Sequence, residues 1–108
     1  MLPLNIEELL TPIGLAHWTM GDGYFTEYIV KICMDNFSKE EVLNFIKVLE
    51  EKFGIEATIN KRSNPNNNIV WRVIVSKSSM EKLKLLVVPH MIPEMLYKVG
   101  IKKYNKQD

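Results

Sequence analysis

An acidic residue, Asp22, ends a short apolar stretch that otherwise carries no charge. The stretch covers residues 15–23 and reads LAHWTMGDG. The C-terminal end of a helix has partial negative charge, so a carboxylate there is disfavoured unless it faces a cation or has a chemical role. The structural alternative is a core helix that Gly23 ends as a C′ cap, with Asp22 exposed to solvent. The spacing alone favours that structural alternative, so other features of the chain must decide.

A second set of candidates lies on one face of a predicted antiparallel sheet. Its members are short hydrogen-bonding groups mixed with cations. They are Lys31, Thr58, Asn60, Arg62, Arg72 and Ser76. Arginine suits guanine edges, asparagine suits adenine, lysine suits phosphate, and a β-ribbon fits the major groove of DNA. This face is a candidate DNA-binding surface, although the residues alone favour an ordinary solvated sheet face.

Other chemistries have little support in the sequence. His17 lies in the apolar stretch and is expected to be a packed histidine, and His90 has no ligand partner at metal-binding spacing. A single cysteine, Cys33, excludes an intramolecular disulfide and a cysteine-based zinc cluster. Gly21 and Gly23 flank Asp22, but the motif lacks the third glycine of a dinucleotide-binding fingerprint.

The apolar stretch belongs to a helix predicted over about residues 12–21. Thr11 is a good N-cap, and Pro12 at the first helical position loses no hydrogen bond. Apolar or small residues occupy both sides, so we expect a helix buried all round. Gly14 and Gly21 lower helix propensity, but they would let a second helix approach closely.

The rest of the chain alternates extended and helical segments. We expect a hairpin over 24–35 that turns near 26–27, and a helix over 39–53 with Ser38 and Glu41 as a capping box. Strands are expected over 55–62 and 69–76, on either side of an asparagine-rich turn. A third helix should run from Ser78 or Ser79 to Pro89. Short helical turns are expected over 6–10 and 93–97. The 108 residues thus predict one α+β domain, residues 1–108, with one antiparallel sheet.

Composition limits the partners and the location. The net charge is +1, but the charges are unevenly distributed. Residues 1–30 contain acids and neither lysine nor arginine, whereas most of the charged residues in 56–106 are basic. That asymmetry hints at a polyanion-facing surface. The longest apolar runs are too short for a membrane span, and the acidic N-terminus predicts no signal peptide. The excess of lysine, asparagine and isoleucine suggests an AT-rich, organellar gene, so we expect a mitochondrial or other organellar location.

The apolar stretch resembles the motif helix of LAGLIDADG homing endonucleases. Residues 11–23, TPIGLAHWTMGDG, are most similar to the second repeat of the organellar two-repeat branch. The resemblance continues through DNFS at 35–38, IVSKSSM at 74–80 and PHMIPEMLYK at 89–98. These blocks follow the family order over nearly the whole chain, which makes the resemblance far more specific than the motif alone.

The resemblance implies an αββαββα fold whose sheet forms a DNA-binding saddle, and two such units packed through their motif helices. It implies metal binding by Asp22 and Gly21, with Mg²⁺ or Mn²⁺ as the ion. Lys98 matches the family's catalytic lysine best, and Lys77 is the second candidate. The implied contact surface between units consists of Gly14, His17, Trp18 and Gly21.

The implied activity is metal-assisted hydrolysis of double-stranded DNA at a specific site by an intron-encoded endonuclease. One motif supplies one acid, so we expect a homodimer, with a separately encoded LAGLIDADG half or a fragment as alternatives. Two other functions stay open: an RNA-binding maturase that assists splicing of intron RNA, and an inactive half-domain.

Overall fold

The first helix, α2 (Pro12–Asp22), begins and ends close to the predicted limits. In this computed structural model, which describes residues 10–101, the Thr11 hydroxyl accepts a hydrogen bond of 3.0 Å from the backbone N–H of Gly14. The expectation of a helix buried all round is wrong for the single chain. Leu15, Ala16, Thr19 and Met20 are buried, whereas the outward face is exposed at Ile13, His17, Gly21 and Asp22. The Thr11 cap and an inward apolar stripe form α2 despite its two glycines, and its other face remains open.

Gly23 ends α2 differently from the predicted C′ cap. Its φ of −93° and ψ of 161° are extended rather than left-handed, and it begins strand β1 (Gly23–Thr26). A Cβ atom at this position would lie 2.7 Å from the carbonyl oxygen of Thr19. The position therefore needs glycine for space, because the chain turns back against the last turn of the helix.

The first hairpin joins β1 to β2 (Ile29–Met34) through a two-residue turn. Glu27 and Tyr28 both adopt left-handed conformations, with φ of 53° and 71°. Positive φ at both central residues is the type I′ geometry that matches the twist of a hairpin. The turn lies one residue later than predicted, and Thr26 pairs with Ile29 across it.

Helix α3 (Lys39–Phe53) has the predicted limits and the predicted capping box. The Ser38 hydroxyl accepts from the N–H of Glu41 at 3.2 Å, and the Glu41 carboxylate accepts from the N–H of Ser38 at 2.9 Å. Gly54 ends the helix in the left-handed region with φ of 69°. The buried face of α3 consists of Val42, Phe45, Val48 and Leu49.

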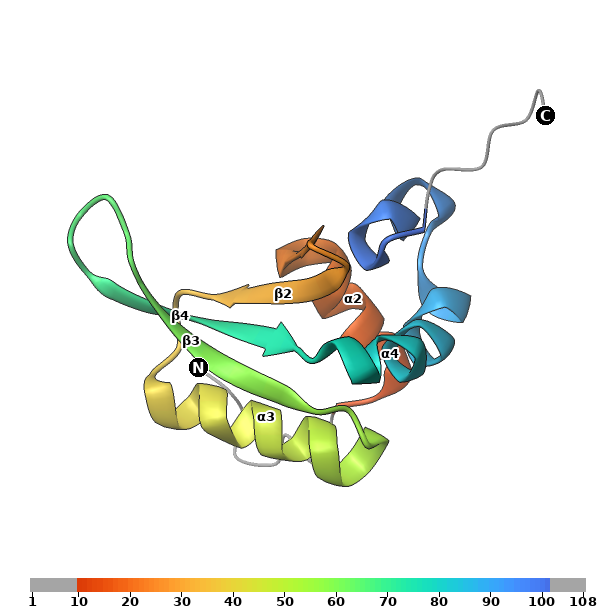
Figure 1. Ribbon diagram of the computed structural model, residues 1–108, viewed down its shortest axis with the longest axis horizontal. Helices are drawn as coiled ribbons and strands as arrows, with labels where there is room; N and C mark the ends of the chain where they lie inside the picture. The colour runs from red at the N-terminus through yellow and green to blue at the C-terminus, as the bar shows by residue number, and fades with distance from the viewer. Residues whose placement is uncertain (1–9, 102–108) are drawn as a thin grey trace.

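Four antiparallel strands form one sheet in the order β1-β2-β4-β3, as predicted for an α+β domain. Strands β3 (Ala57–Ser63) and β4 (Ile69–Val75) form the second hairpin, which extends beyond β2 as a two-stranded ribbon (Figure 1). Val30, Ile32, Met34, Val73 and Val75 are buried toward the helices. The opposite face of the sheet carries the polar residues.

The C-terminal part packs four short helical elements around α2 and β1. These are η1 (Lys77–Ser79), α4 (Met80–Val87), η2 (Val88–His90) and η3 (Pro93–Val99). The predicted third helix is confirmed as α4, and the predicted turn at 93–97 is a 3-10 helix that continues to Val99. The turn expected over 6–10 falls almost wholly outside the described residues. No helix within the described part is long and apolar enough to cross a membrane.

Candidate metal site and nucleic-acid interface

Asp22 lies at the C-terminal end of α2, exposed, next to the start of β1. Within residues 10–101 its carboxylate has no hydrogen bond and no ion pair. The helix end therefore places an uncompensated acid beside backbone carbonyls that also carry negative charge. Such an arrangement favours a cation in the same place.

The oxygen ligands at this helix end are of the type that a hard divalent ion prefers, but there are too few of them for a complete site. Mg²⁺ and Mn²⁺ prefer carboxylate, carbonyl and water oxygens, which Asp22 and the last-turn carbonyl of Gly21 offer. Over the described residues, no group of three or more His, Cys, Asp or Glu side chains could hold a metal. The described part of one copy therefore offers too few side-chain ligands for a complete metal site.

The two lysines implied by the resemblance occupy different surroundings. Lys98 lies in η3, half-buried, and η3 packs against β1, the strand that begins directly after Asp22. Lys77 is exposed at the start of η1, and its ammonium nitrogen lies 5.6 Å from the ring centroid of Tyr28. Lys98 thus belongs to an element packed on the strand that follows Asp22, whereas Lys77 contacts the hairpin turn.

The sheet register puts the predicted DNA-binding residues on a common face. Lys31 pairs with Ile74, which pairs with Thr58 on the other side, and Arg72 pairs with Asn60. Residues two apart in a strand face the same way, so the whole predicted set shares the face that is turned away from the core. The set is Lys31, Thr58, Asn60, Arg62, Arg72 and, just past the end of β4, Ser76.

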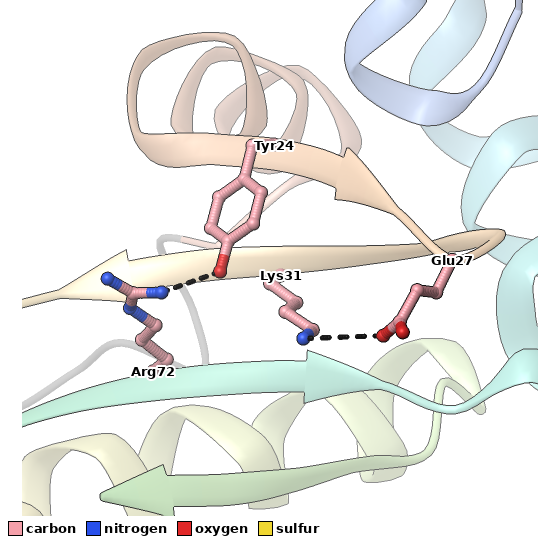
Figure 2. A network of polar contacts seen from close by, with 4 residues as sticks. All are labelled: Tyr24, Glu27, Lys31 and Arg72. Atoms are coloured by element: carbon pink, nitrogen blue, oxygen red, sulfur yellow. Dashed lines mark hydrogen bonds and ion pairs between the residues drawn. The ribbon is translucent and has the colours of Figure 1, made fainter. Parts of the chain in front are cut away.

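Two polar pairs hold the cations nearest to β1 (Figure 2). Arg72 donates from Nη1 to the Tyr24 hydroxyl at 2.7 Å, and the guanidinium carbon lies 5.5 Å from the centroid of the Tyr24 ring. Lys31 Nζ lies 4.0 Å from Glu27 Oε1, with the Glu27 side chain 81% exposed. The exposed ion pair contributes little, so Lys31 can exchange Glu27 for another anion at small cost.

Residues farther along the sheet are less constrained. Thr58, Asn60 and Arg62 are exposed on β3 and make no side-chain hydrogen bond within the described part of the chain. The Ser76 hydroxyl lies 3.2 Å from that of Ser78. Strand β3 therefore carries side chains able to adapt to a ligand, whereas Arg72 is held in advance.

Tyr24 is the site residue that the sequence analysis missed. Its contact with Arg72 crosses the intervening strand β2, since Tyr24 pairs with Lys31 and Arg72 pairs with Cys33. Sequence alternation assigns faces within one strand, but it does not say which strands are neighbours. The position of Tyr24 two residues after Asp22 was the available signal.

Two of the four residues of the predicted contact surface between units, His17 and Gly21, are exposed. Gly14 and Trp18 are half-buried, and a Cβ added at Gly21 would meet no atom of the described residues within 4 Å. The Trp18 ring packs inward, with its centroid 4.6 Å from that of Phe45 and 5.8 Å from that of Phe37. The outward face of α2 is thus open at His17 and Gly21, and Trp18 fixes the helix on the core.

The fold and these residues define a LAGLIDADG unit. The sequence model of the LAGLIDADG DNA endonuclease family matches residues 1–83, and the chain belongs to this family. The solved structure "The homing endonuclease I-WcaI bound to its DNA recognition sequence" is similar to it, with a TM-score of 0.79 and 27% identity over 94% of this chain. The predicted family and the predicted fold are therefore confirmed.

Curated relatives include both endonucleases and maturases. Intron-encoded endonuclease ai4 of Dictyostelium discoideum is 36% identical over 98 residues, which are 91% of this chain and 60% of that protein. Cytochrome b mRNA maturase bI2 of Saccharomyces cerevisiae is 35% identical over 100 residues, or 93% of this chain and 23% of that protein. The chain covers 46% of the I-WcaI chain. In each comparison it spans only part of a longer protein.

Proposed function

We propose that this chain is one unit of a site-specific DNA endonuclease that hydrolyses phosphodiester bonds with divalent metal ions. The observation that carries the proposal is the position of Asp22. Within residues 10–101, an exposed carboxylate without a hydrogen-bond or ion-pair partner ends a helix whose outward face is uncovered, next to a sheet face of cations and hydrogen-bonding groups. The relatives named as endonucleases, and the neighbour described with its DNA recognition sequence, support the same activity.

The proposed role of each residue follows from its position in the fold. The outer sheet face would bind duplex DNA, with Lys31 on phosphate and Arg62, Arg72, Asn60 and Thr58 at base edges. Asp22 and the Gly21 carbonyl would hold Mg²⁺ or Mn²⁺, and a bound ion would activate water and stabilise charge on the phosphate. Lys98, from an element packed on β1, is our candidate for the positive charge beside that phosphate, ahead of Lys77.

Completion of the metal site requires a second unit. We propose a homodimer joined through the outward face of α2, around Gly14, His17 and Gly21, with the target a palindromic or near-palindromic duplex. A separately encoded LAGLIDADG half could take the place of the second copy. In either case two Asp22-type carboxylates would face each other, and the metal ions would offset their repulsion. The organellar composition and the intron-encoded relatives support a mitochondrial or other organellar location.

Replacing Asp22 by Asn tests the proposed activity. We expect Asp22→Asn to abolish cleavage of a plasmid library with randomised inserts in Mg²⁺ and to leave retention of duplex DNA at low salt nearly unchanged. The reason is that the amide keeps the shape of the carboxylate but loses the charge that binds the ion. Sequencing of cut ends measures cleavage, and filter binding measures retention.

Asp35→Asn is the matched control, because Asp35 is also an exposed acid next to a sheet strand and close enough to act on Cys33. Cleavage by Asp35→Asn should equal that of the wild type. Equal activity of wild type and Asp22→Asn would refute the role of Asp22.

A maturase is the second candidate function, favoured by the 35% identity to a cytochrome b mRNA maturase. The same polar sheet face, or the basic C-terminal half, would then bind intron RNA. Splicing of host intron RNA with and without the protein separates the two functions. Splicing that persists in Asp22→Asn would indicate an RNA role independent of the metal site.

A further inference from the structure

Tyr24 and Arg72 form a preorganised pair between the metal site and the sheet face. Tyr24 follows Asp22 by two residues on β1, and Arg72 lies on β4, so the pair spans β2 (Figure 2). The contact combines a 2.7 Å hydrogen bond with a cation–π contact, in which the guanidinium carbon lies 5.5 Å from the ring centroid. An arginine side chain otherwise loses considerable rotamer entropy when it is ordered by a ligand. Here that ordering is already done in the absence of a ligand.

The nitrogen donors of the Arg72 guanidinium differ in their surroundings. Nη1 gives one hydrogen to Tyr24, and Nε is buried without a hydrogen-bond partner among the described residues. Nη2 makes no hydrogen bond within the described residues and, unlike Nε, is not among the buried unsatisfied atoms, so the Nη end reaches the surface. An arginine with its Nε side blocked and its Nη end free presents a forked donor in one direction. Tyr24 accepts the hydrogen bond and therefore keeps its own O–H as a donor.

We propose that Tyr24 is a positioning residue that aims the Nη end of Arg72 at a guanine, which makes this pair a determinant of sequence specificity. Guanine offers O6 and N7 in the major groove, the two acceptors that a forked arginine donor matches. The inference rests on the proposed function, namely binding of duplex DNA by this sheet face. Because Tyr24 is two residues from Asp22, the guanine belongs to the inner part of the target, close to the cut.

Removal of one hydroxyl tests the pair. Wild-type protein would be used to select from a duplex library with randomised positions at low salt, and the selected sequences would show one guanine preference per half-site. We expect Tyr24→Phe to reduce that preference several-fold and Arg72→Lys to remove a preference of about tenfold, the usual discrimination of a bidentate contact. Preferences at the other positions should persist, since the ring and the charge remain.

Tyr28→Phe is the matched control. Tyr28 is also on the first hairpin and 74% exposed, and its hydroxyl makes no hydrogen bond within the described residues. This variant should select the wild-type sequence. Tyr24→Phe in the Arg72→Lys background should cause no further loss, because the two residues act as one unit. A melting temperature of Tyr24→Phe within a few degrees of that of the wild type would separate this positioning role from a purely structural one.

The outcomes distinguish the inference from the function on which it rests. If wild type selects a sequence and Tyr24→Phe selects the same one with the same strength, the positioning role is refuted and DNA binding stands. If Tyr24→Phe weakens every position equally, the pair serves stability or general affinity, which also refutes it. If wild type retains no duplex at low salt, the proposed DNA-binding function fails, and the inference fails with it.

Discussion

Cys33 lies at the centre of the outer sheet face, between Arg72 on one neighbouring strand and the Asp22 end of the sheet on the other. Burial is the main cause that raises the pKa of its thiol above the ordinary 9.0. The charge of Arg72 lowers the pKa, Asp35 and Asp22 raise it, and Arg62 lowers it. The thiol is therefore kept neutral next to Arg72 and Arg62, which we assign to the DNA face, and to Asp22, which we assign to the metal site.

This raised pKa predicts a pH dependence of stability. The folded state holds the Cys33 proton more tightly than the unfolded state, so the stabilisation is complete below pH 9.0 and is lost as pH rises above it. The free energy of unfolding should therefore fall more steeply as pH rises above 9.0 in the wild type than in Cys33→Ser. Urea unfolding across that range measures the difference. If the unfolding free energies of the wild type and Cys33→Ser change in parallel with pH, the raised pKa of Cys33 is contradicted.

At the scale of the elements, local signals in the sequence predicted most of the fold. The limits of α3 follow from Ser38, Glu41 and Gly54, because capping and a left-handed ending are decided by adjacent residues. The turn at Glu27 and Tyr28 was placed one residue early, since neither residue is the glycine or asparagine that usually marks positive φ. The Tyr24–Arg72 contact was missed because it depends on strand order, a non-local property.

The capping box of α3 should be worth a measurable part of the stability. Ser38→Ala removes the acceptor for the N–H of Glu41 and is expected to cost about 1 kcal/mol of unfolding free energy. Denaturant unfolding gives the value. Ser63→Ala, an exposed serine at the end of β3 without a side-chain hydrogen bond in the described chain, is the control and should change stability little. Equal effects of the two variants would show that the cap does not stabilise α3.

At the scale of the whole molecule, two exposed surfaces are candidates for contact with the second unit that we propose. One is the outward face of α2, with Ile13 53% exposed and Gly21 open. The other is a groove of about 270 Å³ between α4 and the segment near Ile101, where Leu85 is 77% exposed. Only the α2 surface would bring a second Asp22 close to the first, because that acid ends the same helix. The metal chemistry therefore favours α2.

Gly21→Ala separates folding from association and so tests this choice. In the part of the single chain that the structure describes, the added methyl group meets no atom within 4 Å, and alanine favours a helix over glycine by up to about 1 kcal/mol. The variant monomer should therefore be as stable as wild type or slightly more stable. In a dimer packed through α2, the same methyl group would hold the two helices apart, so sedimentation should shift from twice the 12.6 kDa chain mass toward the monomer.

Leu85→Ala alters the competing surface and should leave the dimer intact. Dissociation by Leu85→Ala but not by Gly21→Ala would move the interface to α4, and the two Asp22 carboxylates could then no longer be expected to share a metal site.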